Sequence, residues 1–118
     1  MFWLEAPERP AAATSWKRHG IDAGIRPRAL AAGDIDGDGD PEVVVAEFVA
    51  SEKSEQAHRA FIFERAGDGS WERAELGGPS FPLGSLDAID VSGDGRLDLI
   101  GHGFPQPVIS FYENATRR

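Results

Sequence analysis

The sequence predicts an all-β fold built from antiparallel sheets of short strands. Two acidic, glycine-rich segments begin at Asp34 and Asp90, 56 positions apart, and a period of this length indicates repeated structural units. The stretches around them are short and rich in β-branched and aromatic residues, which favour strands. Fourteen glycines and eight prolines supply the turns that such a chain needs.

The predicted strands follow from short apolar stretches bounded by Gly, Pro and Asp. A Pro/Ala-rich connection separates the first two strands, and the motif Ala66-Gly67-Asp68-Gly69 indicates a hairpin turn between the fifth and sixth. Trp16 and Trp71 stand at equivalent places in the repeat and are expected to pack inside their units. The nine predicted strands cover residues 1–6, 15–22, 28–33, 42–48, 60–65, 70–76, 86–89, 97–101 and 107–113.

These strands group into units of four. If the strands of one unit are named a, b, c and d, the chain runs c–d, a–b–c–d, a–b–c. A complete unit at 28–76 is thus flanked by partial units at 1–22 and 84–114. In an antiparallel meander the a–b and c–d turns lie at one end, and the b–c and d–a connections lie at the other. Both acidic segments are a–b turns, so the charged insertion Ser51–Arg59 and His102 are expected at the opposite end.

The two acidic segments, loop one (residues 34–42) and loop two (residues 90–98), have the chemistry of calcium sites. Carboxylates at alternate positions of a tight turn can direct their oxygens to one point, and glycines at the fourth and sixth places provide the required backbone freedom. Calcium takes many oxygen ligands in a flexible arrangement. Loop two has a serine at its third place and should bind calcium more weakly. The predicted ligands are Asp34, Asp36, Asp38, the carbonyl of Asp40, and Glu42 in loop one, and Asp90, Ser92, Asp94, the carbonyl of Arg96, and Asp98 in loop two.

Two other interpretations of the loops are weaker. A solvated Asp-Gly turn explains one such segment but not its recurrence. An EF-hand needs a bidentate Glu at place twelve and a helix on each side, whereas place twelve is Val45 in loop one and Gly101 in loop two.

The residues between the first two ligands of each loop, Ile35 and Val91, alternate with the ligands and are expected to pack into the sheets.

The pattern DxDGDGxxD between two short hydrophobic strands resembles the FG-GAP/VCBS repeat, the calcium-loop blade of integrin-type β-propellers. Two positions depart from it, because Glu42 replaces the usual final Asp and Ser92 replaces the usual second Asp. The resemblance implies β-propeller blades of four antiparallel strands, two bound calcium ions, and an extracellular or cell-surface location.

A closed propeller typically needs about four to eight blades, and this chain supplies about two. We therefore expect an open fragment of a longer propeller, or a subunit that completes one by self-association. Because the family serves adhesion, lectin and enzyme-associated roles, the expected function is protein or glycan binding. The alternative is a segment of a propeller-bearing carbohydrate-active enzyme, a lyase or a hydrolase.

Composition narrows the partners. The formal net charge of −8 argues against binding to nucleic acid or to anionic membranes. No apolar run is long enough to span a bilayer, and Met1–Glu5 lacks the basic start and apolar core of a signal peptide. The chain has no cysteine, no nucleophile-elbow serine and no histidine pair at metal-ligand spacing. No catalytic residue is predicted.

Overall fold

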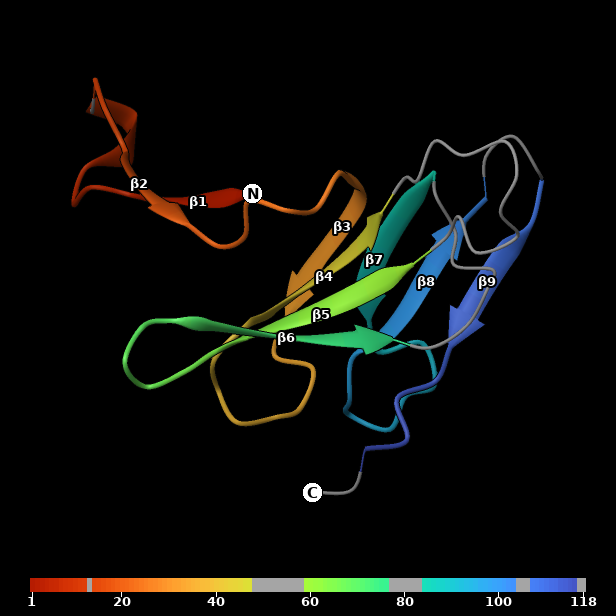
Figure 1. Ribbon diagram of the computed structural model, residues 1–118. Helices are drawn as coiled ribbons and strands as arrows, with labels where there is room; N and C mark the ends of the chain where they lie inside the picture. The colour runs from red at the N-terminus through yellow and green to blue at the C-terminus, as the bar shows by residue number, and fades with distance from the viewer. Residues whose placement is uncertain (13, 48–58, 77–83, 104–106, 117–118) are drawn as a thin grey trace.

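The computed structural model describes residues 1–12, 14–47, 59–76, 84–103 and 107–116, which form three antiparallel sheets (Figure 1). The predicted all-β fold is confirmed. These described residues form nine strands whose ends all lie within two residues of their predicted positions, and they contain one short 3-10 turn. The elements are β1 (Phe2–Glu5), η1 (Pro10–Ala12), β2 (Lys17–Gly20), β3 (Pro27–Gly33), β4 (Glu42–Glu47), β5 (Ala60–Arg65), β6 (Trp71–Leu76), β7 (Ser85–Ile89), β8 (Asp98–His102) and β9 (Ile109–Tyr112).

The sheets repeat one arrangement. The order is β1-β2 in the first, β3-β4-β5-β6 in the second and β7-β8-β9 in the third, and every neighbouring pair is antiparallel. Leu30 pairs with Val45 and Leu86 pairs with Gly101, so the second and third sheets share one register across the 56-residue period. The described residues do not close into a ring. The division of the chain into segments 1–22, 28–76 and 84–114 stays a prediction.

The middle sheet is covered on both faces, which explains its run of consecutive valines. Val44 joins the apolar cluster toward the third sheet, together with Leu86 and Leu99. Val45 joins the cluster on the opposite face with Phe61 and Phe63. Successive side chains of a strand point to opposite faces, so a strand between two layers needs apolar residues at every position.

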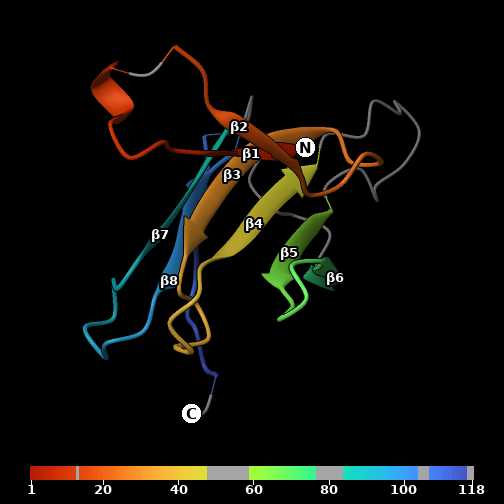
Figure 2. The same cartoon turned by 90° about the vertical axis from the view of Figure 1, so that its left-hand side faces the viewer.

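Each face of the middle sheet packs against a neighbouring sheet. Strand β3 packs beside β7, which places the second and third sheets side by side (Figure 1). The β1–β2 hairpin lies on the other side, in front of the middle sheet in Figure 2. Met1 and Ile21, at the base of this hairpin, pack against the cluster around Phe63.

Two packing expectations are corrected. Trp71 packs against the Phe63 cluster as expected, but Trp16 precedes β2 in an exposed position. Ile35 packs against the Val44 cluster, whereas Val91 is half exposed. In both corrected cases the apolar side chain belongs to an outer sheet, which has a described neighbour on one side alone.

Both acidic loops lie at the same end of the sheets, the lower end in Figure 1. At the opposite end, Glu47 is buried and accepts hydrogen bonds from the Arg59 guanidinium, at 2.7 Å, and from the Arg26 backbone N–H, at 3.3 Å. Arg59 is therefore a structural partner of β4. The rest of the predicted insertion Ser51–Arg59 lies outside the described residues.

Replacement of Phe63 should test the core. Phe63 is 1% exposed at the centre of β5, so Phe63→Ala should lower the free energy of unfolding by about 3–5 kcal/mol. The matched control is Phe2→Ala on β1, where the residue is 46% exposed. Urea denaturation of both variants measures the difference, and equal losses would contradict this description of the core.

Candidate metal centre

Loop one folds around the carboxylate of Asp34. This side chain accepts hydrogen bonds from the backbone N–H groups of Gly37, at 2.8 Å, and Gly39, at 3.1 Å. Both glycines have positive φ angles, 83° and 100°, which side-chain-bearing residues adopt only at a cost. The loop can therefore turn tightly enough to bring its acidic side chains together.

The next two carboxylates each accept one backbone N–H group, from the residue two positions further along the chain. Asp36 Oδ1 accepts from the Asp38 N–H at 3.0 Å, and Asp38 Oδ1 accepts from the Asp40 N–H at 2.8 Å. Asp40 itself is exposed, and its predicted contribution is a backbone carbonyl. Each bond fixes one oxygen of a carboxylate and gives the loop a regular, acid-lined shape.

Glu42 completes loop one from the first position of β4. Its side chain is 2% exposed, and Oε2 accepts from the N–H groups of Ile35, at 2.7 Å, and Asp36, at 3.2 Å. The other oxygen, Oε1, is buried and has no hydrogen-bond partner among the residues that the structure describes. Burial raises the pKa of Glu42 above its usual value, against the opposing effect of the two N–H donors.

The carboxylates form two overlapping groups. One oxygen from each of Asp34, Asp36 and Glu42 lies within 4.8 Å of the others, and the same holds for Asp36, Asp38 and Glu64. Glu64 was not among the predicted ligands. It sits near the end of β5, and the c–d turn that follows shares its end of the sheet with loop one. That meander rule, together with the acidic side chain, was the signal that could have identified it.

Loop two has the same backbone design. Asp90 accepts from the N–H groups of Gly93, at 2.7 Å, and Gly95, at 2.9 Å, and also from the Asp94 N–H at 3.1 Å. The Asp94 carboxylate accepts from the Arg96 N–H at 2.9 Å. The two loops therefore share their turn geometry, although Ser92 replaces one carboxylate.

The last carboxylate of loop two differs from its counterpart Glu42. Asp98 is fully buried at the start of β8. Its Oδ2 accepts from the N–H groups of Val91 and Ser92, both at 3.0 Å, and its Oδ1 accepts from the Asn114 N–H at 2.8 Å. These donors, with Asn114 first, lower the pKa of Asp98 below its usual value. Both oxygens of this buried carboxylate are thus paired within the chain.

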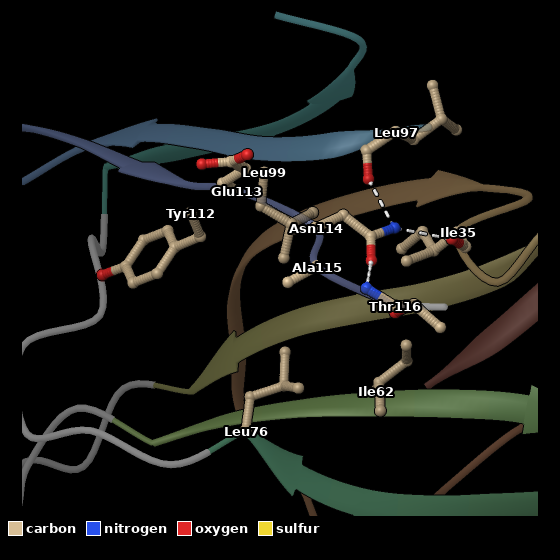
Figure 3. Close-up of a pocket in the computed structure, with 10 residues that line it drawn as sticks. All are labelled: Ile35, Ile62, Leu76, Leu97, Leu99, Tyr112, Glu113, Asn114, Ala115 and Thr116. Atoms are coloured by element: carbon tan, nitrogen blue, oxygen red, sulfur yellow. Dashed lines mark hydrogen bonds between the residues drawn. The ribbon is translucent and has the colours of Figure 1, made fainter. Parts of the chain in front are cut away.

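Asn114 links the two loops. Its side-chain amide donates to the carbonyl oxygens of Ile35 in loop one, at 2.7 Å, and Leu97 in loop two, at 3.0 Å (Figure 3). A pocket of about 470 Å³ lies beside it, between apolar side chains of the two facing sheets such as Ile62 and Leu99. Asn114 therefore connects the two acidic loops of neighbouring sheets. The sequence pattern did not indicate this role.

The fold and these loops define a β-propeller-type repeat module with acidic turns. Residues 27–48 match the family model of the FG-GAP repeat, and this segment contains β3, loop one and β4. This match agrees with the resemblance that the sequence pattern of loop one indicated. No curated protein and no solved structure matches the chain. Within the described part of the chain, no helix has the length and apolar character needed to cross a membrane.

Removal of the Asn114 amide should weaken the junction between the sheets. Asn114→Ala leaves the carbonyl oxygens of Ile35 and Leu97 without these donors, which should lower the free energy of unfolding by about 1–3 kcal/mol. Glu113→Ala, at the exposed neighbouring position, is the control and should change it by less than about 0.5 kcal/mol. Urea denaturation reports both, and an unchanged Asn114→Ala would show that the amide does not tie the loops.

Proposed function

We propose that this chain is a calcium-binding β-propeller repeat module with a calcium site in loop one. The ligands are Asp34, Asp36, Asp38, the carbonyl of Asp40, and Glu42, as the sequence pattern predicted. Two observations on Glu42 carry the proposal. Its Oε1 is buried without a described hydrogen-bond partner, and one oxygen of its carboxylate lies within 4.8 Å of oxygens of Asp34 and Asp36.

Charge explains why a cation suits this loop. Loop one carries five acidic residues and no basic residue. Two like charges about 4 Å apart repel by roughly 4 kcal/mol at the effective dielectric of a protein surface. A buried oxygen such as Glu42 Oε1 also loses its solvation without gaining a donor. A hard divalent ion supplies opposite charge to all of these oxygens at once, and Glu64 offers a further carboxylate from β5.

The expected role of the ion is structural. Loop one joins β3 to β4, the strands that carry Ala31 and Val44 into the core between the sheets. A ligand that binds the folded state alone, at about 100 times its dissociation constant, adds roughly 2.7 kcal/mol to stability. For a domain whose whole stability is typically about 5–15 kcal/mol, this contribution is large.

The module is further proposed to bind a protein or a glycan, in an extracellular or cell-surface setting typical of FG-GAP proteins. On the face opposite the acidic loops, the described candidates are Arg59 and the exposed side chain of His102. Affinity electrophoresis with a panel of soluble polysaccharides, comparing the parent with His102→Ala, tests the glycan class. The role as a segment of a carbohydrate-active enzyme stays the alternative prediction.

Calcium should raise the melting temperature through loop one. In the parent chain, saturating calcium should raise it by on the order of 10 °C relative to a chelator, and Asp36→Asn should remove most of this increase. Asp68→Asn is the matched control, because Asp68 accepts from the Ser70 N–H in an exposed turn outside both loops. A melting temperature that the chelator leaves unchanged in the parent would refute the calcium proposal.

Strand β9 has a largely exposed apolar surface. Its apolar surface includes Ile109, which is 78% exposed, and Phe111, and we propose that another copy or the remainder of a longer propeller covers it. The isolated chain should therefore self-associate, and Ile109→Glu should shift its mass toward the monomer in light scattering. Ala11→Glu, in the exposed η1 turn, controls for the added charge. A parent chain that stays monomeric at high concentration would contradict self-association.

A further inference from the structure

The two loops differ in the number and sign of their charged residues. Loop one contains five acidic residues, whereas loop two contains three acidic residues and Arg96. Arg96 stands at the place that Asp40 occupies in loop one. This one exchange replaces an acid by a base inside an otherwise equivalent turn.

The partly exposed Arg96 guanidinium lies between the Asp94 carboxylate of loop two and the segment that follows β9. One terminal nitrogen contacts the Asp94 carboxylate, and the other donates to the carbonyl oxygen of Thr116 at 3.1 Å. Arg96 Nε is buried and has no described hydrogen-bond partner, so the terminal nitrogens hold the side chain in place. Arg96 thus brings a positive charge onto Asp94, the residue that would otherwise be a central metal ligand.

The remaining acceptors of loop two are also used. Both oxygens of Asp90 and both oxygens of Asp98 accept backbone N–H groups. The contrast is sharpest at the buried position, where Asp98 Oδ1 receives the Asn114 N–H but Glu42 Oε1 receives no described donor. Both oxygens of Asp34 in loop one accept N–H groups in the same way. The loops therefore differ at Arg96 and at the buried position, and these two differences make loop two fit a calcium ion less well than loop one.

We propose that Arg96 takes the place of a cation in loop two, so that this turn is closed without metal and the chain binds one calcium ion. This departs from the two sites that the sequence pattern predicted. The ion count rests on the proposed calcium site in loop one, whereas the role of Arg96 does not.

The central experiment converts loop two into loop one. Ser92→Asp restores the carboxylate at the third place of the loop, and Arg96→Asp removes the positive charge beside Asp94. In isothermal titration calorimetry with calcium chloride, the parent should bind one equivalent and the double variant two. The same double change in an Asp36→Asn background should bind one equivalent, whereas Asp36→Asn alone should bind none. Arg9→Asp with Ser15→Asp, at two exposed positions outside the loops, matches the charge change and should leave one equivalent.

A second measurement needs no calcium. In chelator, Arg96→Gln should lower the melting temperature, because it removes the positive charge from Asp94. If Arg96 contributed only a backbone carbonyl to a metal site, Arg96→Gln would have the same melting temperature in chelator as the parent, and this result would contradict the role of the guanidinium.

The outcomes separate the two proposals. Two equivalents bound by the parent, one of them lost in Asp94→Asn, would overturn the role of Arg96 even if the double variant does not fold. No calcium bound by the parent would refute the loop-one site. In that case, a lower melting temperature of Arg96→Gln in chelator would still support the role of the guanidinium.

Discussion

The crowding of carboxylates in a nine-residue turn is the constraint on which the rest of the structure depends. Each loop must reverse the chain between two core strands, and it does so by directing acidic side chains toward its own backbone N–H groups. These bonds shape the turn but concentrate negative charge within it. Ile35, which packs against the core, and the pairing of β3 with β4 lie directly beside this charge.

The acidic loops of the second and third sheets share one turn geometry but differ in their charged residues. Loop one keeps its acids, and one buried oxygen of Glu42 has no hydrogen-bond partner among the described residues. Loop two has exchanged one acid for Ser92 and another for Arg96, and its buried Asp98 obtains a third donor from Asn114. The two loops thus keep one turn geometry and one register between their flanking strands although their charged residues differ.

Strand positions could be predicted from the sequence because they depend on local patterns. Alternating or continuous apolar residues and Asp-Gly turns set the strand limits, and the 56-residue period showed which strands correspond. The roles of the Arg96 and Asn114 side chains could not be obtained in this way, and Glu64 could have been identified only through the order of the strands in the meander. Their roles depend on which strand end lies beside which loop, and on where a long side chain finds a partner. Trp16 shows the same limit, because equivalence in the repeat does not guarantee a neighbour that buries the ring.

The bonds of Asn114 have a consequence for chemical modification. Asn114, Ala115 and Thr116 fit the acceptor triplet for N-linked glycosylation. In the folded chain both amide hydrogens of Asn114 are engaged, one with each loop, so the nitrogen that would carry the sugar is already used. A glycan at this position would have to be attached before the third sheet docks, and it would then keep the two sheets from meeting in this arrangement. A glycan on Asn114 and the docked arrangement of the two sheets therefore exclude each other.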